Sequence, residues 1–305
     1  MSRLRIATSL GLAAVCLWPA CTESAVDVAT SIFPISAIVR EVGGEKVNIT
    51  TIVPAGSDPH HFELTPSKAK AVHEADVVFL IGGHFDRWVL GEETGESEIC
   101  LLVEFHKAFK DSLIPVGDSF NPHFWLDPLF AREIARIACM ALCTVDLPGS
   151  DHYRNRAEAF MTRLDSLHLS SKARLASAGL EAYVAFHPAW TYFARRYSLR
   201  EYGTIEISHE AEPSAKHIAQ AVKQMREDGI RFILAEEFSN LDLARGVASQ
   251  TGAAIVVLDP LGGEDRPGRD SYFGLIDYNI SLIENSTDPA EARQESNGRT
   301  NSQTE

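Results

Sequence analysis

A segment in the middle of the chain contains neither proline nor glycine and is rich in alanine, leucine, arginine and glutamate. It covers residues 151–177. Apolar side chains recur along it near helical spacing, at Ala157, Phe160, Leu164, Leu167 and Leu175. The pattern predicts one helix of about 25 residues, which at 1.5 Å per residue spans roughly 40 Å. A helix of that length can serve as a stiff connection between two lobes.

Short runs rich in β-branched residues alternate with helical patterns on both sides of this segment. The strand-like runs are 26–32, 47–53 and 76–82 before it, and 182–186, 232–235 and 253–258 after it. Helical patterns lie at 36–42, 66–75 and 214–228. Such alternation predicts parallel sheets built from βαβ units. We therefore expect an α/β protein with two Rossmann-like βα lobes, each with its own core, joined by one long rigid helix.

These patterns also give the expected domain boundaries. Residues 24–147 form the N-terminal lobe, 148–177 the linking helix and 178–284 the C-terminal lobe. Residues 285–305 are polar and are typical of a disordered tail. Residues 1–23 have a positively charged start and an apolar core too short to span a bilayer, which is typical of an export signal. Lipidation at Cys21 is the alternative to plain cleavage.

Composition narrows the class of partner. The chain has 305 residues and a net charge of −14. This acidity argues against nucleic acid as a partner, because phosphate binding needs clustered lysine and arginine. After the signal the chain has three cysteines and no CxxC motif, so neither a thiolate zinc site nor a redox motif is indicated. Cys139 and Cys143 are four residues apart in a helical pattern, which is poor geometry for a disulfide, and are expected to be core residues.

Three histidines are spaced almost evenly along the chain, each near the end of an apolar run. They are His60, His123 and His187, and a carboxylate, Asp259, ends a further apolar run. In open α/β sheets, ligands bind beyond the carboxyl ends of the strands, so we expect these side chains to meet in the cleft between the lobes. Three imidazoles and one carboxylate suit a borderline divalent cation such as zinc.

Each of these histidines, taken alone, is more often a surface-loop residue, and the chain has 11 histidines. His61 is the closest rival of His60. Adjacent side chains in an extended segment point opposite ways, so only one of the two is expected to face the cleft. A metal-bound imidazole also needs a partner for its second ring nitrogen. Asp58, Glu63 and Glu236 are the candidates for that role.

Five motifs follow one another between about residues 28 and 283. They are Asp58-Pro59-His60 with Glu63 and Thr65-Pro66-Ser67, Pro122-His123-Phe124-Trp125-Leu126-Asp127-Pro128, His187-Pro188-Ala189-Trp190-Thr191-Tyr192-Phe193, Glu212-Pro213-Ser214, and Leu258-Asp259-Pro260-Leu261-Gly262. Together they resemble the zinc and manganese solute-binding proteins of bacterial ABC importers, the cluster A-I type. The resemblance implies two Rossmann-like lobes, a single long linking helix and a metal between the lobes. It gives the ligand roles to His60, His123, His187 and Asp259.

The resemblance also bears on which metal is bound. The third ligand of that family is histidine in zinc-type members and often glutamate in manganese-type members, so His187 implies Zn²⁺. Two departures from the family leave Mn²⁺ or Fe²⁺ as alternatives. The stretch 91–100 is short and acidic, where many zinc-type members have a long histidine-rich loop. Asn121 replaces the acidic residue usual before Pro122, which is expected to loosen the support of His123.

The expected function is that of an extracytoplasmic, monomeric solute-binding protein that captures zinc and delivers it to an ABC-transporter permease. A closed site with four protein ligands leaves no coordination position for a substrate, so an enzyme is not expected. The alternatives are a manganese- or iron-binding member of the same class, a surface lipoprotein adhesin, and a zinc hydrolase with Asp259 or Glu236 as general base. For the hydrolase, neither His-Glu-x-x-His nor Gly-x-Ser-x-Gly is present.

Overall fold

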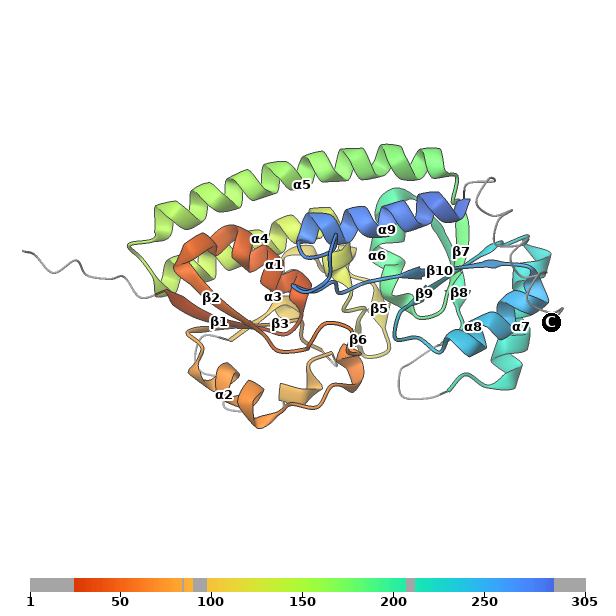
Figure 1. The fold of residues 1–305 in the computed structure, drawn as a ribbon, viewed down its shortest axis with the longest axis horizontal. Coiled ribbons are helices and arrows are strands. Elements are labelled where there is room, and N and C mark those ends of the chain that lie inside the picture. The colour runs from red at the N-terminus through yellow and green to blue at the C-terminus, as the bar shows by residue number, and fades with distance from the viewer. Residues whose placement is uncertain (1–24, 84, 90–97, 207–211, 288–305) are drawn as a thin grey trace, which may run out of the picture.

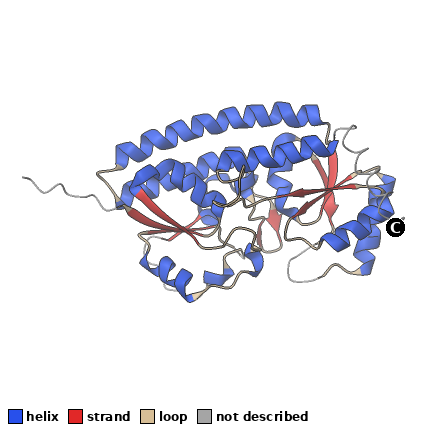
Figure 2. Ribbon diagram, viewed as in Figure 1, coloured by secondary structure: helices blue, strands red, loops and turns tan. Residues whose placement is uncertain are grey.

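Two parallel sheets lie at opposite ends of an elongated molecule, and long helices run across both (Figures 1 and 2). The structure is a computed structural model that describes residues 25–83, 85–89, 98–206 and 212–287. The expected export signal, Cys21, and nearly all of the expected tail lie outside these ranges. Within them, no helix is both long and apolar enough to cross a membrane.

The N-terminal lobe contains a four-stranded parallel sheet with the order β2-β1-β3-β4. Its strands are β1 (Val26–Thr30), β2 (Val47–Thr51), β3 (Val77–Leu80) and β4 (Glu98–Cys100). Its helices are α1 (Phe33–Gly43), α2 (Pro66–Glu74), α3 (Leu101–Phe109) and α4 (Pro128–Val145). A short antiparallel pair, β5 (Pro115–Val116) and β6 (Ser119–Phe120), lies between α3 and α4.

The C-terminal lobe contains a second parallel sheet, with the order β10-β9-β7-β8. Its strands are β7 (Ala182–Ala185), β8 (Arg200–Thr204), β9 (Phe232–Glu236) and β10 (Ala254–Leu258). Its helices are α6 (Thr191–Tyr197), α7 (Ala215–Glu227), α8 (Leu241–Thr251) and α9 (Tyr272–Thr287). If the strands of each lobe are numbered in chain order, both sheets read 2-1-3-4. The two lobes therefore share one topology.

The linking helix is α5 (Ser150–Ala178), 29 residues long, which confirms the prediction from its lack of proline and glycine. It ends at Gly179, whose left-handed backbone (φ 76°) is a common helix stop. Ion pairs fix both halves of α5. Arg163 pairs with Glu41 of α1 in the N-terminal lobe, and Arg174 pairs with Asp277 and Glu284 of α9 in the C-terminal lobe. The helix therefore braces both lobes along its length (Figure 1).

The prediction that each lobe has its own core is wrong for the largest apolar cluster. That cluster joins the two lobes, since it includes Phe79 of β3, Trp125, Trp190 and Leu258 of β10. Smaller clusters belong to single lobes. Hydrogen bonds also cross between the lobes, because the indole N–H of Trp125 donates to the Pro260 carbonyl at 2.9 Å. The junction between the lobes is therefore packed like a domain interior.

Two local predictions need correction. Residues 285–287 of the expected tail belong to α9, which places the helix end at Thr287. Residues 98–100 of the expected acidic loop form β4. Cys139 and Cys143 are free thiols on α4, and Cys100 is also free.

Candidate metal centre

His60 lies in a tight turn that follows β2 and spans Pro59–His61. The Oδ1 atom of Asp58 accepts a hydrogen bond from the His60 backbone N–H at 2.9 Å, and its Oδ2 atom lies 2.7 Å from Nδ1 of His61. The segment is a 3₁₀ turn rather than an extended strand, so successive side chains diverge by about a third of a turn. That geometry separates His60 from its rival His61, whose side chain is 59% exposed beside Asp58.

His123 is held by Asn121. The Oδ1 atom of Asn121 accepts hydrogen bonds from the backbone N–H and from Nδ1 of His123, both at 2.9 Å. This contact leaves Nε2 of His123 as the metal-binding nitrogen. The amide nitrogen of Asn121 donates to the Pro188 carbonyl at 2.7 Å, next to His187 in the other lobe. The expectation that Asn121 loosens the support of His123 is therefore wrong, because the amide orients the ring and also links the two lobes.

His187 lies two residues beyond the end of β7 and directly precedes the Pro188–Trp190 turn. Its position is the one expected for a ligand at the carboxyl end of a strand in a parallel sheet. Like His123, it is only 4% exposed. The strand thus delivers an imidazole from the C-terminal lobe to the two that come from the N-terminal lobe.

His60, His123 and His187 converge, and we call them the histidine triad. One ligand nitrogen from each lies within 4.8 Å of the others. Among the described residues this is the one group of three or more His, Cys, Asp or Glu side chains so arranged. The Nε2 atoms of His60 and His123 are 3.3 Å apart. Tetrahedral zinc with Zn–N bonds of 2.0–2.1 Å requires ligand nitrogens about 3.4 Å apart, so this pair already has the required spacing.

Aromatic rings and a cleft surround the histidine triad. Phe85 lies edge-on to His60 with ring centroids 4.8 Å apart, and Trp125 lies 5.1 Å from His123. A cleft of about 540 Å³ opens between the lobes, lined in part by His187, Asp58 and Glu206. Sequence reasoning gave no role to Phe85 or Trp125, since a single aromatic residue in a loop carries no periodic signal.

Two of the proposed partners for the second imidazole nitrogen lie elsewhere. Glu63 is exposed. Glu236 is fully buried at the end of β9, where it accepts hydrogen bonds from the indole of Trp190 at 3.1 Å and from the hydroxyl of Ser239 at 2.8 Å. Burial raises the pKa of Glu236 to about 8. Its carboxyl group therefore holds a proton at neutral pH and positions Trp190, in the turn that begins at His187.

Replacing Glu236 with glutamine is expected to stabilise the protein at alkaline pH. The ordinary pKa is 4.5, so between pH 4.5 and 8 the unfolded carboxyl is ionised while the folded one is protonated. The contribution of Glu236 to the free energy of unfolding is therefore fully present below pH 4.5 and is lost as the pH rises through 8. Glutamine stays neutral, so the gain over wild type should be on the order of a few kcal/mol at pH 8.5 and small at pH 5. Urea unfolding at both pH values measures it.

The matched control for this substitution is Glu158→Gln, on the exposed surface of α5. Its free energy of unfolding should follow that of the wild type at both pH values. Equal stability of Glu236→Gln and wild type at pH 8.5 would mean that Glu236 ionises in the folded protein without penalty.

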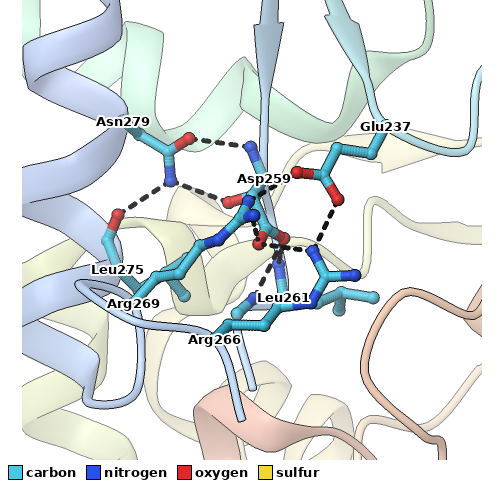
Figure 3. A network of polar contacts seen from close by, with 8 residues as sticks. Glu237, Asp259, Leu261, Arg266, Arg269, Leu275 and Asn279 are labelled. Atoms are coloured by element: carbon cyan, nitrogen blue, oxygen red, sulfur yellow. Dashed lines mark hydrogen bonds and ion pairs between the residues drawn. The ribbon is translucent and has the colours of Figure 1, made fainter. Parts of the chain in front are cut away.

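Asp259 directly follows β10, and its carboxylate contacts neighbouring backbone N–H groups and two arginines (Figure 3). Its Oδ1 atom accepts hydrogen bonds from the backbone N–H groups of Leu261 and Gly262, both at 2.9 Å. Its Oδ2 atom lies 2.8 Å from Arg269 and 3.4 Å from Arg266. The structure thus brings together three of the four predicted ligands, the histidines. The fourth, the carboxylate of Asp259, contacts two arginines. A ligand role for Asp259 stays a prediction.

Comparisons with known proteins agree with this fold. The sequence profile of the family described as "Zinc-uptake complex component A periplasmic" matches residues 28–286. A zinc-binding lipoprotein named AdcA from Streptococcus pneumoniae is 25% identical over 288 residues, which cover 87% of this chain and 56% of the relative. The chain thus spans about half the length of the curated relatives that it matches first.

Solved structures of metal-binding proteins have a similar fold. A crystal structure of ZnuA is 26% identical, with a TM-score of 0.74, and the match covers 87% of this chain and all of that one. The laminin-binding protein Lmb of Streptococcus agalactiae, described as bifunctional with adhesin and metal-transporting activity, is 25% identical with a TM-score of 0.74. That match covers 86% of this chain and 99% of the other.

Proposed function

This chain belongs to the periplasmic zinc-uptake component A family, and from that premise we propose that it captures zinc outside the cytoplasm and delivers it to an ABC-transporter permease. The family is a component of metal uptake, not an enzyme. The observation that carries the proposal is the histidine triad, whose ligand nitrogens lie within 4.8 Å of one another. Imidazole nitrogens suit zinc better than manganese, which prefers oxygen ligands.

The proposed ligands are His60, His123 and His187. The arrangement supports capture between lobes, since two imidazoles come from the N-terminal lobe and one from the C-terminal lobe. The hydrogen bond from the Asn121 amide to the Pro188 carbonyl holds the loop of His123 next to the loop of His187. A monomeric state and lipid tethering at Cys21 are finer proposals, and Cys21 lies outside the described residues.

The zinc hydrolase alternative is disfavoured by the state of its two candidate bases. A general base must be ionised and near the metal-bound water. Glu236 holds its proton, because burial raises its pKa to about 8, and it accepts a hydrogen bond from Trp190. Asp259 is already engaged by backbone N–H groups and arginines. Neither side chain is available to activate water.

Competitive metal binding tests the proposal. The mature chain, residues 24–305, is equilibrated with Zn²⁺ and Mn²⁺ at equal free concentration, and the bound metal is determined by mass analysis. We expect one zinc ion per chain that excess manganese does not displace. A chain that binds neither metal would overturn the proposal, and preferential retention of manganese would assign it to the other metal class.

A further inference from the structure

The carboxylate of Asp259 has all of its acceptor positions filled by its own chain. An ionised carboxylate offers about four lone-pair sites. Here two backbone N–H groups occupy Oδ1 and two guanidinium groups face Oδ2. The backbone of Asp259 is fixed as well, because Asn279 of α9 bonds both its N–H and its carbonyl, at 2.8 and 2.7 Å (Figure 3). A metal can use this carboxylate only if one of these contacts is given up.

The two arginines, which we call the arginine pair, are themselves held in place. Arg266 and Arg269 each lie 2.5 Å from the carboxylate of Glu237, which follows β9. The Arg269 guanidinium also lies over the ring of Tyr278, 4.5 Å from its centroid. Both arginines are only about one-fifth exposed, at 21% and 17%. A partly desolvated arrangement in which two guanidinium groups share two carboxylates is stronger than an exposed ion pair.

The loop that carries the arginine pair is also packed against the N-terminal lobe. Glu264 forms an ion pair with Arg40 of α1. Arg266 passes so close to Gly56 that a Cβ atom at Gly56 would lie 2.3 Å from Nη2 of the guanidinium. Gly56 lies in the loop between β2 and His60, and its φ of +78° also favours glycine. The arginine pair therefore lies at the junction between the lobes and is fixed from both sides.

We infer that the arginine pair withholds Asp259 from the metal and thereby sets metal choice. This inference rests on the proposed function. With Asp259 on the arginines, the histidine triad offers three nitrogen donors and no carboxylate oxygen from this position. Manganese loses more than zinc by this arrangement, because hard divalent ions depend on oxygen ligands. Arg266 and Arg269 thus act as specificity-determining residues without contacting the metal.

The test compares metal preference in the mature chain before and after the arginine pair is removed. In the double variant Arg266→Gln/Arg269→Gln, Asp259 is released, and the ratio of manganese to zinc affinity is expected to rise about tenfold. Adding Asp259→Asn to the double variant should return the ratio to the wild-type value. Arg40→Gln is the matched control, because Arg40 contacts the same loop at Glu264 and does not contact Asp259.

A crystal structure of the zinc-loaded wild type gives an independent readout if the double variant does not fold. We expect the Asp259 carboxylate to remain on the arginine pair. A carboxylate oxygen within about 2.2 Å of zinc would overturn the inference, as would an unchanged affinity ratio in a folded double variant. Zinc bound by the histidine triad under either result would leave the proposed function standing. A wild type that binds no zinc would remove both.

Discussion

Replacing His123 with alanine is expected to weaken zinc binding at least about a hundredfold. Structural zinc sites release roughly 10–16 kcal/mol on binding, so the loss of one ligand in three or four removes about 3 kcal/mol or more. His123 is the ligand with the best-defined support, since Asn121 holds both its ring and its backbone. Titration of the mature protein against a chromophoric zinc chelator measures the change.

The fold should survive this substitution. Asn121 still accepts a hydrogen bond from the backbone N–H of residue 123, and its amide still reaches the Pro188 carbonyl across the lobe junction. His73→Ala is the matched control, because His73 is exposed on α2. Its zinc affinity and thermal unfolding should match those of the wild type. If His123→Ala folds normally and keeps its zinc affinity, His123 does not belong to the ligand set.

The elements predicted well are those whose pattern is local and periodic. β1, β3, β7 and β9 are largely buried parallel strands, and such strands read as continuous runs of apolar and β-branched residues. The partly buried edge strands β2 and β10 were recognisable from their β-branched residues. The linking helix α5 was recognisable because helix-breaking residues are absent over its whole length. The edge strands β4 and β8 were missed, because β4 has only three residues and β8 contains charged residues and a glycine.

The histidine triad was predicted from the topology rule that ligands gather beyond the carboxyl ends of parallel strands. What the sequence could not give was the set of long-range polar partners. Asn121 contacts His123 locally, but its tie to Pro188 spans 67 residues. The arginine pair lies in a loop with no periodic pattern, and only folding places it on Asp259. Asp259 was therefore assigned by its position after a strand, without knowledge of the groups that compete for it.

The structure also changes which observation favours a metal-binding protein over a zinc hydrolase. Four protein ligands, as expected from the sequence, would fill the coordination sphere of the metal and leave no position for a substrate. If the arginine pair withholds Asp259, the protein supplies three imidazole ligands and leaves one coordination position of the metal open. Several zinc enzymes also have three protein ligands and one open position. The state of the two bases considered for a hydrolase then carries the distinction, because Glu236 is protonated and Asp259 is already engaged.

Acidification is expected to weaken zinc binding on the order of ten thousandfold between pH 7 and pH 5. A histidine must be neutral to bind a metal, and one with the ordinary pKa near 6.5 reduces affinity about 25-fold over this interval. Three such ligands acting together multiply this factor. The measurement is zinc affinity at half-unit pH intervals, corrected for the chelator's own protonation. An affinity independent of pH would contradict a site built from three histidines.

The slope of zinc affinity against pH depends on the number of histidine ligands. His123→Ala should lose one factor of about 25, which leaves a fall of several hundredfold over the same interval. Acid unfolding driven by the two most perturbed carboxyl groups does not account for the effect. Burial raises the pKa of Asp86 to about 7 and that of Glu236 to about 8, so both groups favour the folded state more as the pH falls. A decrease in affinity with a reduced slope in His123→Ala would therefore report proton competition at the histidine triad itself.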